Sequence, residues 1–374
     1  MRRESTLLLT VVFALVMIGV VMIYSASAAY AFAGERLIRH LIYVAIGLVA
    51  FFLAVQFDYR RLAQPFLFRF LVVLSLTLLV AVLMPGIGVA RGGAQRWIEI
   101  RGFTFQPSEL AKFALLVLLA VKLSENQSQL KEFKRGYLPC VLIILTFAAL
   151  ILAERDLGTP VVLCAAAFFM LLMAGAPLRY LVPSVAPAGL AVYLLVITSE
   201  YRKKRMMTFL DPWEDGNGGL GDGFQLIQSM NAFVKGAVWG LGPGAGEQKL
   251  NYLPASETDF IFAVWGEETG LIGSLVLIGL FMLLLFLSLR IALNAPDLFG
   301  TLLAAGVASL ISFQAALNMA VATGLLPTKG LPLPFISLGG TSLVVFMGMM
   351  GIVINIGAQS EAPRRRSVGP ATAQ

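Results

Sequence analysis

Long apolar runs, separated by short polar segments, dominate the chain. Most runs approach the length of about 20 residues that an α-helix needs to cross the hydrocarbon core of a bilayer. Only helices and closed barrels satisfy their backbone there, and the lack of apolar–polar alternation favours helices. The pattern predicts an all-α polytopic membrane protein with about ten transmembrane helices, near residues 7–29, 38–56, 66–84, 109–123, 137–154, 159–176, 181–199, 260–289, 298–323 and 341–357.

Three segments fall outside this pattern. Residues 200–258 predict a large extracytoplasmic loop between the seventh and eighth helices. Residues 324–340 mix proline and glycine with apolar residues, which is typical of a re-entrant loop, because non-helical backbone at membrane depth has to be buried by protein or reached by water. Residues 358–374 predict a disordered basic cytoplasmic tail. Residues 1–357 are therefore expected to form a single transmembrane domain.

Composition agrees with a membrane protein. Hydrophobic residues make up 58% of the chain and charged residues 13%, whereas soluble domains carry about 25% charged residues. The first apolar run is too long for a signal peptide, so we interpret it as an uncleaved helix. If the N-terminus is cytoplasmic, ten helices return the C-terminus there and place the basic residues of 60–61, 131–135 and 364–366 inside, as the positive-inside rule requires.

Half of the 28 Lys and Arg residues nevertheless fall on the outer side in this topology. A chain that followed the orientation rule alone would be depleted of them there. An anion such as a phosphate group accounts for the excess, because Arg and Lys are the usual phosphate ligands. The alternative is pairing with the nearby acidic residues Glu99, Glu109, Glu154 and Asp156.

Several kinds of site are excluded by residue number and spacing. Cys140 and Cys164 lie in apolar runs without a metal or redox spacing, and we interpret them as small buried hydrophobic residues. His40 is the only histidine, which rules out a metal site built on histidines. The glycine-rich segment 240–246 lacks the spacing of a nucleotide-binding P-loop.

Three carboxylates, Asp259, Glu267 and Glu268, stand at the mouth of the eighth apolar run. Ionisable groups at membrane depth are costly and usually serve a function. Ser256 or Thr258 is predicted to cap this helix, with Asp259 in its first turn. Asp259 is the first candidate for a catalytic residue. The two glutamates point in other directions around an ideal helix, which favours a structural role for them.

Other segments place charges on the outer side. Glu109 and Lys112 share one face near the start of the fourth helix, either as a structural ion pair or as an acid and a base that face an outer cavity. The charged run 154–156 ends the fifth helix, and a tight turn does not require such charges, which favours a functional role. The basic run 201–205 fits either anionic lipid headgroups or substrate phosphates.

Together these segments resemble the SEDS family (shape, elongation, division and sporulation) of polytopic peptidoglycan glycosyltransferases. Leu338 stands where the family commonly has tyrosine, and Glu257 where it commonly has histidine. Residues 24–27 and 326–334 resemble the division members more than the elongation members. The other matching segments are 95–97, 106–112, 209–212, 224–229, 258–263, 266–268 and 337–342, so that the resemblance extends over nearly the whole chain.

The resemblance implies an inverting glycosyltransferase that polymerises lipid II, a lipid-linked disaccharide-pentapeptide, into β-1,4-linked glycan strands. The reaction would take place at the outer face of the bacterial cytoplasmic (inner) membrane, for cell division or elongation. Asp259 is implied as the general base. The implied partners are a class B penicillin-binding protein, which is a transpeptidase, and divisome or elongasome proteins, without nucleic acid. No organic cofactor is implied, and a divalent cation, Mg²⁺ or Mn²⁺, is left open.

The remaining site candidates follow from the same resemblance. The residues expected to contact the substrate or its diphosphate are Arg96, Lys112, Arg155, Lys329 and Ser337. Glu109 and Asp156 are expected to support them or to hold the cation.

Two other functions fit part of the pattern. A lipid II flippase would use the same outer charges, but it should also have polar groups across the full membrane depth, whereas the charges here cluster on the outer half. A non-catalytic scaffold that recruits a division transpeptidase would not need Asp259.

Overall fold

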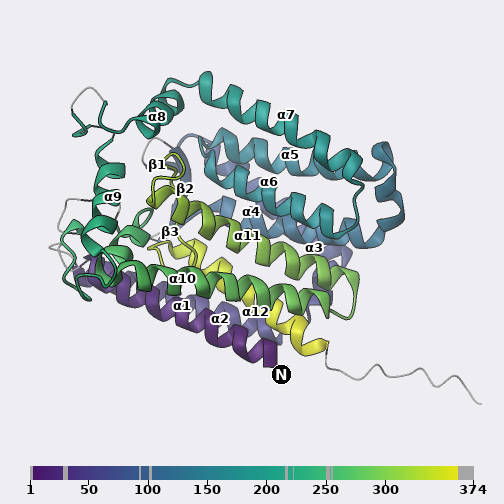
Figure 1. Cartoon of the computed structure of the whole chain (residues 1–374). Coiled ribbons are helices and arrows are strands. Elements are labelled where there is room, and N and C mark those ends of the chain that lie inside the picture. Colours follow the sequence, from purple (N-terminus) through teal and green to yellow (C-terminus); the bar gives the residue numbers. More distant parts are fainter. Residues whose placement is uncertain are drawn as a thin grey trace, which may run out of the picture.

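The structure, a computed structural model, describes residues 3–27, 33–91, 94–100, 103–214, 218–221, 223–249, 253 and 256–360. These residues form twelve α-helices and one small antiparallel sheet. Figure 1 shows most helices running side by side as a bundle, with the sheet, α8 (Glu200–Leu210) and α9 (Phe224–Gly236) gathered toward one end.

Ten of the helices confirm the predicted spans, with ends that differ by a few residues. They are α1 (Arg3–Ser27), α2 (Ala33–Gln56), α3 (Pro65–Leu83), α4 (Pro107–Glu125), α5 (Leu138–Ala153), α6 (Gly158–Met173), α7 (Leu178–Ile197), α10 (Ile261–Leu293), α11 (Leu298–Ala322) and α12 (Gly340–Gln359). Seven of these helices, and α5 together with the preceding η3 (Phe133–Tyr137), are long and apolar enough to cross a membrane. The other two are α4, which carries four charged residues, and α6, which has 16 residues.

Helices α4, α11 and α12 form the buried centre of the bundle. In the most apolar 18-residue stretch of α11, and also in that of α12, 78% is buried inside the protein, whereas only 6% of the corresponding stretch of α7 is buried. α11 packs against α4, α6 and α10, and α12 packs along α2. Leu181 is the only buried residue of α7, and Figure 1 shows this helix at the margin. Because α4 faces protein on most sides, its charges are compatible with membrane depth.

α10 is bent, which corrects the prediction of a continuous helix. Gly270 has φ 68° and ψ −163°, a conformation that glycine adopts far more readily than other residues. A Cβ at Gly270 would overlap the backbone of Val238 and Gly240. The loop that follows α9 therefore crosses α10 at the bend.

The start of α10 also differs from the prediction. The helix begins at Ile261, and the preceding Phe260 provides no side-chain cap. Ser256 and Thr258 therefore do not cap the helix, and Asp259 lies in the turn before it rather than in its first turn. Asp259 therefore does not lie on the same helix as Glu267 and Glu268, so the angles between these residues around an ideal helix do not describe the structure. The contacts of the two glutamates indicate their roles instead.

A three-stranded antiparallel sheet between α3 and α4 has no counterpart among the predicted elements. It consists of β1 (Gly88–Arg91), β2 (Ala94–Ile100) and β3 (Phe103–Phe105), in the order β1-β2-β3. The sequence Gly92-Gly93 is a common two-residue hairpin signal, and 97–100 is rich in residues that favour strands. β2 carries Arg96, one of the predicted site residues.

The segment between α11 and α12 contains no helix or strand over residues 323–339, all of which the structure describes. Its residues Leu331, Leu333 and Phe335 are nevertheless buried, as expected for non-helical backbone at membrane depth. We call residues 323–339 the α11–α12 loop. Beyond residue 360 the predicted disordered tail lies outside the described residues.

Candidate active site

Asp259 and Arg96 border the same small space above Gly330. A Cβ built on Gly330 would lie 3.4 Å from Oδ2 of Asp259 and 3.8 Å from each terminal nitrogen of Arg96. Asn318, on α11, fixes the backbone around this space. Its Nδ2 donates to the carbonyl oxygens of Asp259, at 2.9 Å, and Leu331, at 2.7 Å. The structure thus brings together two residues that are far apart in the sequence.

Arg96 is anchored by Asp156, which follows α5. Nη1 of Arg96 lies 3.1 Å from Oδ2 of Asp156, and the Asp156 side chain is buried. The carboxylate also accepts hydrogen bonds from the N–H groups of Gly158 and Thr159 and from the Thr159 hydroxyl. These donors belong to the first turn of α6, where a negative charge is favoured. Asp156 therefore positions Arg96 and has its oxygens committed to protein donors.

Burial raises the pKa of Asp259 to about 6, because removal from water disfavours the charged carboxylate. The charges of Arg96 and Arg205 oppose this rise, and that of Asp156 adds to it. Burial outweighs the two guanidinium groups, a balance that the sequence leaves open. At pH 7 the carboxylate form still predominates, and a pKa close to the operating pH suits a general base.

Two further cations lie on the elements around Asp259. Arg205, on α8, donates from Nη1 to the carbonyl oxygen of Thr328 at 3.1 Å. Lys329 is half-buried, and burial lowers its pKa while the charge of Asp156 raises it. Within the described part of the chain its ammonium has no hydrogen-bond or ion-pair partner. An added anion would give Lys329 the partner that it lacks.

The turn 154–156 places its three charged side chains differently. Glu154 is fully buried, and neither carboxyl oxygen has a partner among the described residues. Burial raises its pKa to about 9, with a further rise from Asp156 and an opposing effect of Arg96. Arg155 has φ 62° and an exposed side chain that forms no ion pair in the described part of the structure. The structure therefore does not bring Arg155 to Asp259, and its contact with diphosphate stays a prediction.

Lys112 and Glu109 contact each other in the interior of the bundle, and the expected contact of Lys112 with a diphosphate stays a prediction. Lys112 is fully buried, and its Nζ lies 2.8 Å from Glu109 and 2.9 Å from Oε1 of Gln314. The same ammonium lies 4.8 Å from the ring centre of Phe346. Gln314 donates in turn to the carbonyl oxygen of Pro332. The contacts agree with the ion-pair alternative, and the pair supports the α11–α12 loop.

Ser337 has hydrogen bonds within the protein, and its expected contact with the substrate stays a prediction. Its buried hydroxyl donates to the carbonyl oxygen of Thr258, at 2.5 Å, and accepts from the N–H of Leu333, at 2.7 Å. The backbone N–H of Leu338 also donates a hydrogen bond to the carbonyl oxygen of Glu257, at 2.8 Å. The α11–α12 loop is thereby tied to the turn that carries the catalytic candidate.

Glu267 and Glu268 bind the loop that follows α9. Oε1 of Glu268 accepts from Nζ of Lys249, at 2.7 Å, and from the hydroxyl of Ser25, at 2.5 Å. Glu267 accepts from the backbone N–H groups of residues 247–248. These contacts agree with the predicted structural role of both glutamates.

The family model described as "Cell cycle protein", for FtsW, RodA and SpoVE, matches residues 5–362. The chain belongs to the FtsW/RodA/SpoVE family. This confirms the resemblance to the SEDS family. A probable peptidoglycan glycosyltransferase FtsW of Geobacter metallireducens is 42% identical over 362 residues, which cover 95% of this chain and 94% of that protein. Stage V sporulation protein E of Bacillus subtilis is 39% identical over 363 residues, with coverages of 95% and 97%.

Solved structures extend the family relationship to the fold. The rod shape determining protein RodA of Thermus thermophilus superposes with a TM-score of 0.70 at 30% identity, covering 95% of this chain and 97% of that one. A chain from a peptidoglycan synthase complex, described as coordinating polymerization and crosslinking, gives a TM-score of 0.78 at 30% identity and the same coverages.

Arg205 and Asn318 interact with Asp259 in this FtsW/RodA/SpoVE chain, and Glu154 lies near Arg96 and Asp156. All three residues are absent from the predicted site. Arg205 belongs to a basic run and Glu154 to a run of charges. The sequence of each run does not indicate which of its residues belongs to the site. Asn318 offered a clearer signal, because an amide inside an apolar helix needs hydrogen-bond partners at that depth.

The predicted cation ligands do not fit a resident metal ion in this family member. Among the described residues no group of three or more His, Cys, Asp or Glu side chains is placed to hold one. Asp156 is committed to Arg96 and to the first turn of α6, and Glu109 is committed to Lys112.

Proposed function

We propose that the chain is a peptidoglycan glycosyltransferase that polymerises lipid II for cell division, with Asp259 as the general base. Family membership supports the activity, and the relatives named FtsW support the division role. The observation that carries the catalytic assignment is the space above Gly330, which Oδ2 of Asp259 borders at 3.4 Å and the Arg96 guanidinium at 3.8 Å. A base and a cation thus face one position that no side chain fills.

In the proposed reaction the 4-hydroxyl of the acceptor sugar attacks the anomeric carbon of the donor. The new C–O bond forms as the bond to the polyprenyl diphosphate breaks, and its electron pair leaves with the diphosphate. The hydroxyl proton passes to Asp259, which is ionised at neutral pH. Attack opposite the leaving group converts the α-linked donor into a β-1,4 linkage.

Positive charge around Asp259 would stabilise the departing diphosphate. Arg96 is held by Asp156, and Arg205 by the α11–α12 loop, so that both guanidinium groups are positioned before the substrate binds. Guanidinium groups suit phosphate oxygens in geometry and charge. Lys329 adds an ammonium without a partner in the described structure. Preorganised charge of this kind lowers the barrier without reorganisation during the reaction.

No step of this proposal passes through a metal ion. Asp156 and Glu109 are committed to protein donors, as described above. A divalent cation that arrived with the diphosphate would be held largely by phosphate oxygens and water, as Mg²⁺ usually is.

We further propose that Asp259 faces the outside of a bacterial inner membrane and that both termini lie in the cytoplasm. Basic residues of η1 (Tyr59–Ala63), η2 (Gln127–Lys131) and η3 (Phe133–Tyr137) occupy helix ends remote from Asp259, in agreement with the positive-inside rule. The proposed partner is a class B penicillin-binding protein. Similarity to a synthase complex that coordinates polymerization and crosslinking supports it.

The decisive experiment supplies lipid II to the purified chain together with its partner transpeptidase. We expect glycan strands from wild type and none from Asp259→Asn, because the amide cannot accept the proton. Glu247→Gln removes an exposed outer carboxylate and is the matched control, which should remain active. Equal polymer from wild type and Asp259→Asn would refute the catalytic role. Lack of polymer from wild type would favour a flippase, if lipid II crosses vesicles, or a scaffold.

A further inference from the structure

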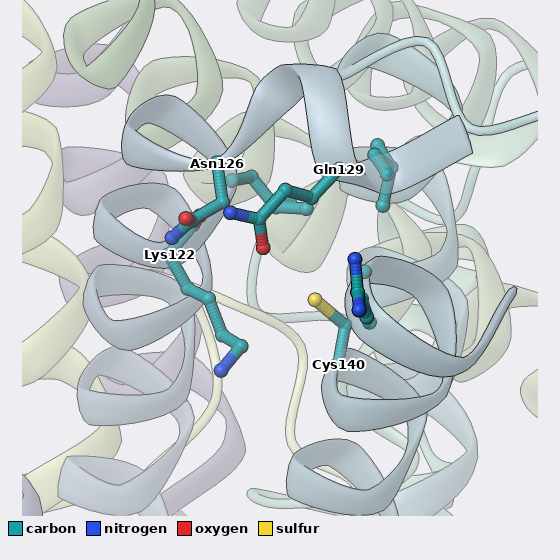
Figure 2. Close-up of a pocket in the computed structure, with 8 residues that line it drawn as sticks. Lys122, Asn126, Gln129 and Cys140 are labelled. Carbon is teal, nitrogen blue, oxygen red and sulfur yellow. The ribbon is translucent and has the colours of Figure 1, made fainter. Parts of the chain in front are cut away.

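A polar cavity of about 180 Å³ lies where the chain passes from α4 to α5, at the end of the bundle remote from Asp259. The chain turns there through η2 and η3. A buried water needs about 10–15 Å³, so this cavity has room for a larger polar group. Figure 2 shows the side chains of Lys122, Gln129 and Cys140 converging on it.

The cavity carries positive charge that the protein leaves uncompensated. Lys122 is partly buried, and its ammonium has no hydrogen-bond or ion-pair partner in the part of the chain that the structure describes. Arg135, also in the lining, approaches no carboxylate of the described residues except Glu132, at 3.8 Å, and both side chains are largely exposed. Glu125 is the other carboxylate of this turn and is also exposed. Because partly buried cations are costly without a counter-charge, the site favours an anion.

Backbone geometry shapes the cavity. A Cβ on Gly136 would overlap the carbonyl group of Gln129, so a glycine is needed for η2 and η3 to approach this closely. Asn126 donates from Nδ2 to the carbonyl oxygen of Lys122 at 3.3 Å, which fixes the end of α4. The amide of Gln129 has no such protein partner in the described structure and offers two neutral N–H donors.

We propose that this cavity binds the phosphate of an anionic phospholipid headgroup, with Lys122 and Arg135 as its cationic ligands. Anionic lipids of the cytoplasmic leaflet attract basic residues, and basic pockets between helix ends are known sites for their headgroups. This assignment uses the proposed topology and is independent of the chemistry at Asp259.

The surroundings distinguish a lipid from free phosphate. Phe133 belongs to η3, as do the lining residues Arg135 and Gly136. It is 44% exposed and packs against the rings of Tyr137 and Tyr180, and Leu178 is 62% exposed at the start of α7. Aromatic residues of this kind gather at the membrane–water interface. Free phosphate would use the charges alone, whereas a lipid also uses the apolar surface beside them.

Native mass spectrometry of the purified full chain tests the inference. The probes are phosphatidylglycerol, phosphatidylcholine with the same acyl chains, and inorganic phosphate. We expect phosphatidylglycerol to be retained in preference to phosphatidylcholine, and Lys122→Met to weaken its binding about tenfold, as loss of a charge-assisted contact predicts. Arg135→Gln is the second variant, at an exposed position that tolerates substitution. Lys134→Met removes the same charge from an exposed neighbour outside the lining and should bind like wild type.

Three results would overturn the assignment. The first is equal retention of the two lipids by wild type. The second is undiminished phosphatidylglycerol binding by both Lys122→Met and Arg135→Gln. The third is thermal stabilisation of the protein by inorganic phosphate together with no retained lipid, which would identify a free-phosphate site.

Discussion

Replacing Glu154 with glutamine probes the energetic consequence of burying a carboxyl group without partners. Glu154 follows the last residue of α5, is 0% exposed, and has no hydrogen-bond partner for either oxygen among the described residues. Burial raises its pKa from 4.5 to about 9, helped by Asp156 and opposed by Arg96. The folded protein therefore holds Glu154 as a neutral acid at neutral pH. Glutamine has nearly the same shape and is always neutral.

The magnitude follows from proton linkage. In the unfolded chain the carboxyl has its ordinary pKa of 4.5 and is ionised at pH 7, whereas in the folded chain it stays protonated up to about pH 9. Folding takes up a proton between these values, so the free energy of unfolding falls as the pH rises through this window. At about 1.4 kcal/mol per pH unit, protonating Glu154 costs folding about 3 kcal/mol at pH 7. Glutamine avoids this cost.

Thermal unfolding in detergent, followed from about pH 5 to about pH 9, measures the difference. We expect Glu154→Gln to be more stable than wild type at pH 7, by up to about 3 kcal/mol, and to approach wild type near pH 5. Glu247→Gln, at an exposed carboxylate paired with Lys235, serves as the control and should not gain stability with rising pH. A glutamine variant that gains nothing at pH 7, or that keeps the wild-type pH slope, would show that Glu154 is charged and solvated.

Three other outcomes are expected. The kcat/KM for lipid II polymerisation should fall tenfold per pH unit below about pH 6, as Asp259 becomes protonated, and an unchanged rate at pH 5 would exclude it as the base. Lys112→Met should lower the free energy of unfolding by about 3–5 kcal/mol, because Glu109 is left buried and unpaired, and Glu109→Gln in the same chain should restore part of that loss in chemical denaturation. Gly270→Ala should lower the free energy of unfolding by about 1–3 kcal/mol through the positive φ alone, and the overlap with the backbone of Val238 and Gly240 should lower it further. A lower melting temperature would report this loss.

The helices could be predicted from sequence because each depends on the length and apolarity of its own residues. All ten predicted spans correspond to helices in the structure. The bend at Gly270 could not be predicted in this way, because its cause is the backbone of Gly240 in a different segment. The three short strands were missed because their pattern covers only a few residues between much longer apolar runs.

The site was predictable only in part. Chemistry and family resemblance predict Asp259 and Arg96 as site residues, and both lie near Gly330 in the structure. Lys112 has the same chemistry, yet it faces Gln314 and Phe346 in the interior. Whether a charged side chain of α4 faces the space near Asp259 depends on distant partners such as Gln314, which is 202 residues away from Lys112. The sequence of α4 contains no information about these partners.

The absence of a side chain at residue 330 gives the reaction space a definite width. An alanine methyl there would lie 3.4 Å from Oδ2 of Asp259 and 3.8 Å from the Arg96 guanidinium, which are ordinary van der Waals distances that demand no rearrangement. The folded chain could therefore accommodate one extra carbon, while an incoming sugar hydroxyl could not share the same place. The methyl group of Gly330→Ala would therefore occupy the position that the sugar hydroxyl needs. It would separate loss of room from loss of charge, because every ionisable group of the site would remain.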